Sequence, residues 1–147
     1  MIRTAGATPI DYTASTVEEY VGAHTGGEGF DIVIDNVGGA TLDASFTAVK
    51  RYRGHVVSAL GWGTHSLAPL SFRGATYSGV FTLMPLLTGR GREHHGHIVA
   101  QAAALADSGR LVPRLDARTF SLEEVNDAFE VIETGSAAGK VVVLPNA

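Results

Sequence analysis

The sequence contains no cysteine among its 147 residues. Disulfide bonds and thiolate-bound zinc are therefore excluded, and this usage fits a cytoplasmic protein. No apolar run approaches the roughly 18 residues of a membrane-spanning helix, so we expect no membrane span. The first residues also lack the long apolar segment of a signal peptide. Lys and Arg number 11 against 15 Asp and Glu, and they form no basic stripe. We therefore expect no nucleic-acid partner.

The composition that remains is that of an ordinary globular protein. Hydrophobic residues make up 45% and charged residues 18% of the chain. A chain of this length and composition can bury a core in one domain. It contains no internal repeat and no low-complexity segment.

The stretch at residues 29–39, GFDIVIDNVGG, organises the prediction. Residues 30–34 are mostly apolar and β-branched, which is typical of a strand buried on both faces of a parallel sheet. Gly38 and Gly39 follow, and a helical pattern begins near Thr41. A strand, a glycine-bearing turn and a helix in this order form the corner where open α/β sheets bind ligands. The glycines equally suit a turn that is merely tight.

Four segments carry helical patterns. Thr16 and Glu19 are spaced as a capping box, as are Ser15 and Glu18, and either pair predicts a short helix that ends at Gly26-Gly27. Ser121 and Glu124 repeat this spacing before the last helix. The other patterns are residues 41–53, with Leu42, Phe46 and Val49 on one apolar stripe, residues 93–108 and residues 122–134.

Extended segments are predicted between these helices. Residues 8–12 fit a short edge strand, because Pro9 cannot donate to a central ladder. Residues 55–60, 71–81 and 140–144 predict further strands, residues 111–115 an extended segment around Pro113, and residues 88–91 a loop. The expected core consists of Ile32, Val33, Ile34, Phe46, Val56, Val57, Leu105, Phe129 and Val142.

Taken together, these segments resemble the C-terminal portion of a medium-chain dehydrogenase/reductase, in particular its quinone-oxidoreductase-like, "zinc-binding dehydrogenase" branch. The resemblance covers nearly the whole chain and implies an α/β fold. That fold is a partial Rossmann-type open parallel sheet with flanking helices and a C-terminal helix-strand extension. The matching residues are Gly6-Ala7 with Ile10-Asp11-Tyr12, residues 29–39, Gly54-His55-Val56-Val57 with Gly61, residues 120–125 with Ala128, and Gly139-Lys140-Val141-Val142.

The resemblance also shows what this sequence lacks. Members of the family are more than twice as long, and no G-x-G-x-x-G motif opens a helix in this chain. Residues 1–91 correspond to the C-terminal half of the nucleotide-binding domain. Residues 92–147 correspond to the extension that returns to the substrate domain. We therefore expect a fragment that binds the cofactor weakly, if at all, and is inactive alone.

In the resembled family, NADP(H) or NAD(H) lies across the strand ends, and hydride passes to or from a substrate such as a quinone or enone. The cofactor carries the difficult chemistry, so no nucleophile is required and no catalytic residue is predicted. Trp62 has an alternative role as a loop aromatic that caps the core. The residues that the resemblance places on the cofactor are Asn36, Val37 and Gly38 near its middle, Leu60, Gly61 and Trp62 beside the nicotinamide, then Ser78, Gly79, Val80 and Lys140.

Ionisable residues offer other interpretations. Three histidines lie between residues 94 and 97, but adjacent histidines at a helix start point in different directions, and only Glu93 is a nearby carboxylate. No metal site is therefore predicted. Asp35 is a conceivable general base, although a carboxylate that ends a parallel strand is more often a turn acceptor. No role is assigned to the isolated His24, His55 and His65.

Two other function classes stay open. The strand end FDIVIDN is similar to the motif that methyltransferases place beside the methyl donor. The second class is a non-catalytic dimerisation module. In the resembled family, the strand corresponding to residues 72–79 often pairs with its symmetry mate, and such pairing needs no cofactor. We therefore expect a homodimer through residues 72–79.

Overall fold

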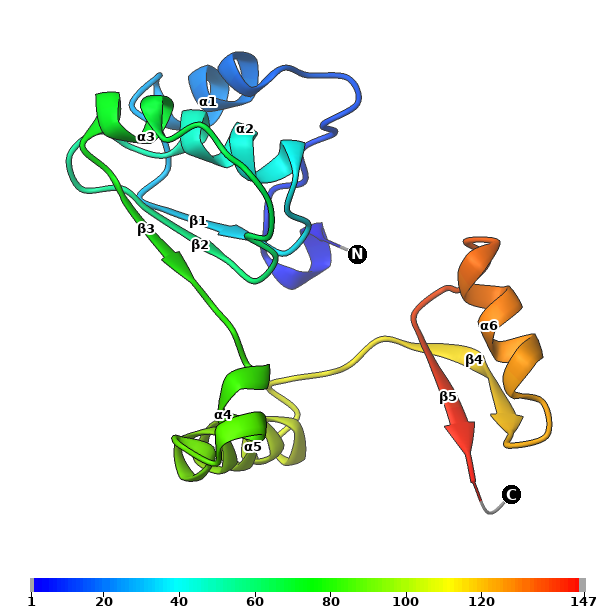
Figure 1. Ribbon diagram of the computed structural model, residues 1–147. Helices are drawn as coiled ribbons and strands as arrows, with labels where there is room; N and C mark the ends of the chain where they lie inside the picture. The colour runs from blue at the N-terminus through cyan, green and yellow to red at the C-terminus, as the bar shows by residue number, and fades with distance from the viewer. Residues whose placement is uncertain (1, 146–147) are drawn as a thin grey trace. The chain divides into compact units, whose positions relative to one another are not determined.

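The computed structural model describes residues 2–145 and divides the chain into two compact units, Met1–Met84 and Pro85–Ala147 (Figure 1). Each unit contains its own parallel sheet beside helices, which confirms the α/β class. No helix within residues 2–145 is long and apolar enough to cross a membrane. The first unit contains α1 (Val17–Thr25), β1 (Ile32–Asp35), α2 (Ala40–Ala48), β2 (His55–Ser58), α3 (Ala68–Arg73) and β3 (Thr76–Gly79). The short helix α4 (Leu83–Thr88) spans the boundary, and α5 (Arg92–Asp107), β4 (Leu115–Ser121), α6 (Val125–Glu133) and β5 (Lys140–Leu144) follow.

The sheet of the first unit has the order β1-β2-β3, with all strands parallel. Its register places Val33 beside Val56 and Val56 beside Tyr77. Helices α1, α2 and α3 lie on the same side of this sheet (Figure 1). The row of Val33, Val56 and Tyr77 belongs to the core under these helices.

The apolar stripe predicted on α2 forms the centre of this core. Leu42, Phe46 and Val49 are all buried and cluster with Val56 and Leu70. The helix, however, ends at Ala48 and does not continue to residue 53. Val49 adopts an extended conformation and bridges to Phe30, so the chain turns towards β2 earlier than predicted. Its side chain is buried beside the helix that it has just left.

The opposite face of the sheet is bare, so the predicted burial of Ile32 and Ile34 is wrong. These side chains are 65% and 68% exposed. Successive residues of a strand point to opposite faces, and in residues 2–84 all the helices that pack on this sheet lie on the Val33 side. Val33 and Val57 are half-buried, short of the expectation.

The predicted strand at residues 71–81 is only partly correct. The chain first forms α3 through Arg73, and the strand begins at Thr76. Pro69 in the first turn and Gly74, at φ 56° after the last turn, are the start and stop signals of this helix. They override the strand preference of Phe72, which is 86% exposed.

The N-terminal prediction is correct for the helix and wrong for the strand. The Thr16 side chain accepts from the Glu19 amide, and the Glu19 carboxylate accepts from the Thr16 amide at 2.7 Å, as a capping box requires. Residues 8–12 form no strand. Asp11 instead accepts hydrogen bonds from the amide and hydroxyl of Thr13, which closes a local turn.

The second unit contains a parallel pair, β4 and β5, with α6 packed against both strands. Strand β5 and helix α5 agree with the prediction, whereas the extended segment predicted at residues 111–115 overlaps β4 only at Leu115. Helix α4 was missed. Helix α6 begins at Val125, not at residue 122, because only half of the second capping box forms: Glu124 accepts from the Ser121 amide. The buried Asp116 accepts from Arg118 and from the Ala138 amide, which joins β4 to the turn before β5.

The core predicted for this second unit is also incomplete. Phe129 is 58% exposed, since Ala128 is the residue of α6 that is buried against the strands. Leu105 is 39% exposed on α5, in which no residue is buried. Val142 is half-buried on β5. Both predictions of full burial on these helices are therefore wrong, because the second unit covers only one face of α6 and leaves α5 largely in solvent.

Candidate functional site

The carboxyl ends of β1, β2 and β3 meet at one edge of the sheet. The register places Asp35 beside Ser58 and Ser58 beside Gly79. All of the predicted cofactor residues except Lys140 lie at or just beyond these three strand ends. Lys140 belongs to β5 of the second unit. The structure therefore brings together the predicted residues of the first unit, as expected for the ligand-binding edge of an open α/β sheet.

The two glycines after β1 have different roles. Gly38 has a φ of 76°, and a Cβ built on it would overlap the carbonyl oxygen of Leu60. A side chain at this position would push apart the ends of β1 and β2, so the fold itself requires this glycine. Gly39 has a φ of 54° at the start of α2, and its Cβ would meet no atom within 4 Å. Its backbone is therefore open to the approach of a ligand.

A hydrogen-bonded network around Asp35 fixes this corner. The carboxylate is 2% exposed and accepts from the Ser58 hydroxyl at 2.6 Å and from the Gly38 amide at 3.0 Å. It also accepts from the Val37 amide, and the Ser58 oxygen accepts from the Leu60 amide at 3.1 Å. Asp35 is thus the turn acceptor of the β1 corner, with its oxygens already committed to the fold.

These bonds also determine the ionisation of Asp35. Burial by itself raises the pKa of this carboxyl group, but the hydrogen bonds from Ser58, Gly38 and Val37 outweigh it. The pKa of Asp35 therefore lies below its ordinary value. A general base that works near neutral pH needs a raised pKa, so this geometry disfavours the general-base interpretation.

A pocket of about 300 Å³ opens between the ends of β2 and β3. Trp62 stands at it with 62% of its surface exposed, and its ring meets that of Phe81 edge to face at 5.3 Å. Trp62 therefore does not cap the core of the first unit. The pocket is lined by Ser58, Ala59, Gly61, Trp62, Tyr77, Gly79, Val80 and Phe81.

Some predicted residues lie outside this pocket. Val37 lines a different cavity, of about 710 Å³, together with Tyr12 and the first turn of α1. Ser78 lies next to Tyr77 on β3 and points to the other face of the sheet, where its hydroxyl is 2.8 Å from His55 Nε2. The Ser78 hydroxyl is therefore already hydrogen-bonded to His55 on that face. The chemistry of the pocket depends on the residues that line it.

The comparison with known proteins identifies the family. A family model described as zinc-binding dehydrogenase matches residues 5–143. The chain belongs to this family. The likeness to a medium-chain reductase is thus confirmed, and the methyltransferase interpretation loses its support.

Relatives of this zinc-binding dehydrogenase chain include proteins of known structure. An alcohol dehydrogenase superfamily protein from Novosphingobium aromaticivorans is 56% identical, with a TM-score of 0.85, over 90% of this chain and 40% of that chain. Quinone oxidoreductase-like protein 2 of Bos taurus is 27% identical over 97% of this chain and 41% of its own length. NADPH-dependent alkenal/one oxidoreductase of Arabidopsis thaliana is 28% identical over 99% of this chain and 31% of its own length. The chain therefore spans about two-fifths or less of these relatives.

The family description names zinc, but the residues present do not fit a zinc site. Residues 2–145 bring together no group of three His, Asp or Glu side chains that could hold a metal ion, and the sequence has no cysteine. The histidines at the start of α5 do not converge on one point: His97 Nε2 lies 3.1 Å from the Gln101 side-chain amide, while the ring centroids of His94 and His95 are 6.5 Å apart. The assignment of this chain to the family rests on the family model that matches residues 5–143, not on a metal site.

Sequence reasoning missed two polar side chains beside the site. His65, which seemed isolated, has its Nδ1 2.9 Å from Asp43 Oδ1, and its Nε2 is buried without a partner among the described residues. The Tyr77 ring packs edge to face on Phe46 at 5.8 Å, and its hydroxyl lies against Gly61. For Tyr77 a signal existed, because alternation along β3 places it on the same face as Val56. For His65 none existed, since its partner lies 22 residues away.

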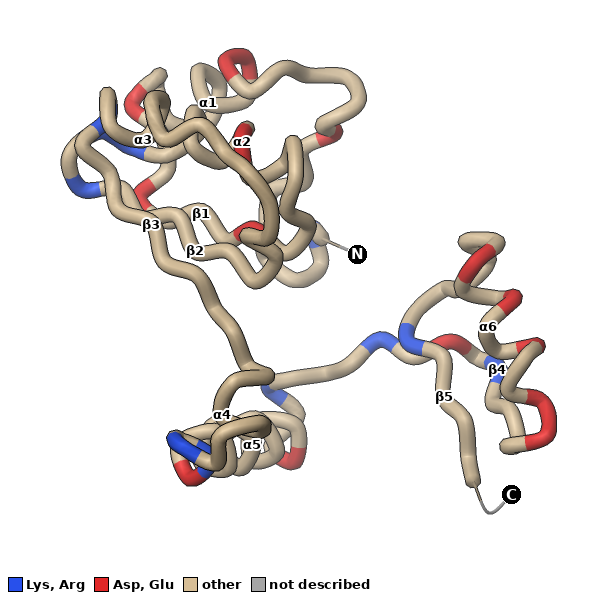
Figure 2. The backbone as a smooth tube through the Cα atoms, viewed as in Figure 1, with Lys and Arg blue, Asp and Glu red and all other residues tan. Residues whose placement is uncertain are grey.

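Four of the five Lys and Arg residues of the first unit lie at the amino ends of the strands, and Arg3 lies apart from them in the N-terminal turn. Lys50, Arg51 and Arg53 precede β2, and Arg73 precedes β3, as the blue segments in Figure 2 show. Lys50 pairs there with Asp31 at 3.1 Å. This group lies at the amino ends of the strands, so it cannot hold the phosphates of a ligand bound at the carboxyl ends.

Proposed function

We propose that this chain supplies the nicotinamide-facing part of the cofactor site in an NAD(P)H-dependent oxidoreductase that reduces quinones or enones. One observation carries the proposal: a pocket with glycines on two sides opens at the carboxyl ends of adjacent parallel strands. The names of the relatives support this class of oxidoreductase, since they include a quinone oxidoreductase-like protein and an alkenal/one oxidoreductase. In this proposal residues 1–91 form the C-terminal half of the cofactor-binding domain, and residues 92–147 form the extension that returns to the substrate domain. The proposed location of the protein is the cytoplasm.

The residues of the chain position the cofactor in this proposal, and the bound nicotinamide supplies the hydride. Asp35 and Ser58 hold the ends of β1 and β2 at a fixed spacing. Gly39 leaves the backbone open beside the middle of the cofactor, where Asn36 and Val37 contribute further contacts. Trp62 and Phe81 form an aromatic wall at the nicotinamide end.

The first prediction is that the chain binds NADPH weakly and saturably but does not catalyse quinone reduction. A G-x-G-x-x-G turn at a helix N-terminus normally holds the pyrophosphate, and the sequence has no such motif. Hydride transfer also requires both reactants in near-attack geometry. Isothermal titration should give a dissociation constant nearer millimolar than micromolar, and NADPH oxidation with a quinone should equal the buffer rate.

A pair of glycine variants provides the control. Gly79→Val adds a side chain to the pocket at a strand position suited to β-branched residues, so it should abolish the weak binding. Gly22→Ala on α1, where a Cβ meets no atom within 4 Å, should leave binding unchanged. An absence of NADPH binding at millimolar concentration would reject the proposed function. Tight binding or turnover would show that the chain is more complete than proposed.

We also propose that the chain forms a homodimer through β3. Such a dimer needs no cofactor, so it would equally be expected of a non-catalytic dimerisation module. Strand β3 ends the described sheet of the first unit, so one of its edges has no partner there. The amides of Thr76 and Val80 bond to Gly54 and Ser58 on the β2 side. By alternation, the amides of Tyr77 and Gly79 point to the open edge. Pairing of two such edges around a two-fold axis would satisfy them.

We expect Gly79→Pro to convert this dimer to a monomer. Proline removes an amide that points to the open edge and leaves the ladder with β2 in place. Gly79→Ala retains the amide and is the matched control, which should stay dimeric. Sedimentation velocity at micromolar concentration measures both variants. A monomeric unaltered chain, or a dimer insensitive to Gly79→Pro, would rule out this interface.

A further inference from the structure

The pocket between β2 and β3 contains a polar group without a role in the proposed cofactor contacts, the hydroxyl of Tyr77. Tyr77 lines the pocket, and its hydroxyl has no hydrogen-bond partner among residues 2–145. The other hydroxyl in the lining, that of Ser58, already donates to Asp35 and accepts from Leu60. The Tyr77 hydroxyl and the indole N–H of Trp62 are therefore the side-chain donors that this lining still offers to a ligand.

The fold holds this hydroxyl in a fixed position. The Tyr77 ring packs on Phe46 at an interplanar angle of 89°, and Phe46 is itself 2% exposed. A Cβ built on Gly61 would overlap the hydroxyl, and a Cβ on Gly79 would lie 3.6 Å from it. The hydroxyl therefore lies close to two glycines, and it lies nearer to Gly61 than to Gly79. A donor held rigidly in this way favours a ligand whose hydrogen-bond acceptor lies at one fixed position relative to the pocket.

The size and walls of the pocket define that ligand further. A volume of about 300 Å³ is at the small end of ligand sites, so it suits one ring with its substituent better than a whole dinucleotide. Trp62 and Phe81 supply aromatic surface, against which a flat ring packs favourably. The fixed Tyr77 hydroxyl and the aromatic walls together favour a planar conjugated ring that carries a carbonyl oxygen.

We propose that the Tyr77 hydroxyl donates a hydrogen bond to the carbonyl oxygen of a planar conjugated ring bound in this pocket, and so is a positioning residue. This inference rests on the proposed function, which offers two sources of such a carbonyl. One is the carboxamide of the nicotinamide, and the other is the quinone or enone substrate. The variant Tyr77→Phe removes the donor and keeps the ring on Phe46.

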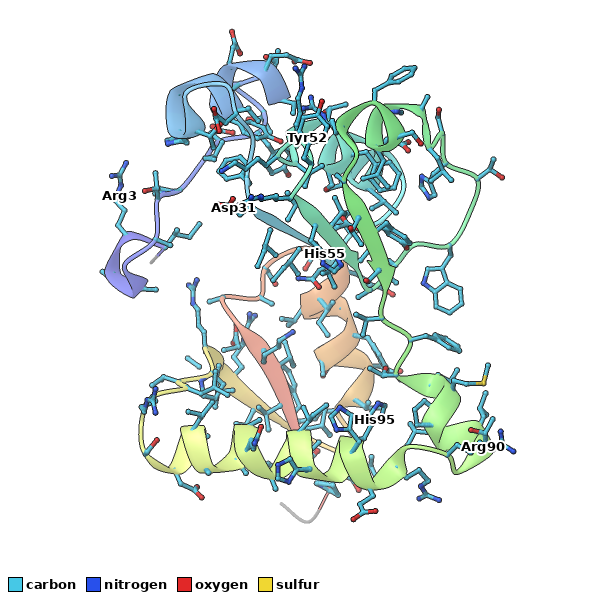
Figure 3. The ribbon with its side chains drawn as sticks, turned by 90° about the vertical axis from the view of Figure 1, so that its left-hand side faces the viewer. Arg3, Asp31, Tyr52, His55, Arg90 and His95 are labelled. Carbon is cyan, nitrogen blue, oxygen red and sulfur yellow. The ribbon has the colours of Figure 1, made fainter. Side chains whose placement is uncertain are left out.

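Trp62 makes the test direct, because it is the one tryptophan of the sequence and lies at the pocket. Its fluorescence is titrated with nicotinamide mononucleotide and, separately, with a sulfonated naphthoquinone, and free N-acetyltryptophanamide corrects for collisional quenching. Loss of one neutral hydrogen bond in Tyr77→Phe should raise the dissociation constant of whichever of the two ligands places its carbonyl in this site about 3- to 10-fold. Tyr52→Phe is the matched control, since Tyr52 lies in the exposed turn before β2 (Figure 3).

A pyridine ribonucleotide without the carboxamide separates positioning from a structural effect. Its affinity should be the same in the unaltered chain and in Tyr77→Phe, because it has no carbonyl to accept the bond. If nicotinamide mononucleotide or the naphthoquinone binds saturably and neither of them loses affinity in Tyr77→Phe, the role of Tyr77 is rejected while the proposed function stands. If neither ligand changes Trp62 saturably in the unaltered chain, both are rejected. The ligand whose affinity falls identifies the source of the carbonyl.

Discussion

Phe46→Ala should lower the unfolding free energy of the first unit by about 3–5 kcal/mol, the usual cost of removing a buried aromatic ring. Phe46 is 2% exposed at the centre of the cluster that contains Leu42, Val49 and Val56. Its ring also supports those of His65 and Tyr77 on two sides. The cavity would therefore remove contacts from α2, from the sheet and from the loop after β2 together. A small domain loses much or all of its stability by this amount.

The fluorescence of Trp62 during denaturation by urea measures this loss for the first unit, in which the residue lies. Ile34→Ala is the control, because it removes an apolar side chain of similar kind from the bare face of the same sheet. An exposed position of this sort should change the free energy of unfolding by no more than about 0.5 kcal/mol. Equal shifts for the two variants would show that the Ile34 face is covered in solution. An unmoved midpoint for Phe46→Ala would remove α2 from the core.

Asp35→Ala is expected to have the second largest effect, a loss of about 2–4 kcal/mol, since it leaves buried donors without an acceptor. The Ser58 hydroxyl and the amides of Val37 and Gly38 all donate to this carboxylate. Ser58 in turn fixes the Leu60 amide, so the loop that carries Trp62 should also shift. We therefore expect a changed emission spectrum of Trp62 in the folded variant as well as a lower unfolding midpoint.

The effect of the negative charge on Asp35 is tested by comparing the stability of the unaltered chain and of Asp35→Asn as a function of pH. The pKa of Asp35 is lower in the folded chain than in the unfolded chain. The ionised carboxylate therefore contributes fully to the free energy of unfolding above the ordinary pKa of an aspartate. This contribution is lost as the pH falls through the lower, folded value. The gap in stability between the unaltered chain and Asp35→Asn should thus be constant near neutral pH and close only in strong acid. A gap that closes between neutral pH and mild acid would contradict the depressed pKa.

Local sequence signals predicted those parts of the fold that depend on neighbours in the chain. The spacing of Leu42, Phe46 and Val49 gave the buried stripe of α2, and the Thr16–Glu19 pair gave the start of α1. Signals that compete locally gave errors. At residues 68–74, β-forming side chains outweighed Pro69 and Gly74 in the prediction, whereas in the structure the helix signals prevail.

Other features depend on contacts that no local pattern contains. The continuous apolar run at residues 30–34 predicts burial on both faces, but burial requires a second layer, and Ile32 and Ile34 have none within the described first unit. The candidate site was predicted from the family resemblance, which supplied the residues at the strand ends. The donors and acceptors that give it chemistry, Tyr77 and the pair of His65 with Asp43, depend on side chains brought together by the fold.

The bare face of the three-stranded sheet also affects how the first unit responds to temperature. Ile32 and Ile34 already contact water in the folded state, so unfolding newly exposes less apolar surface than it would in a sheet covered on both faces. The heat-capacity change of unfolding scales with that newly exposed surface. The stability curve of this unit should therefore be unusually flat: low at its maximum, yet nearly constant from cold to moderate temperatures.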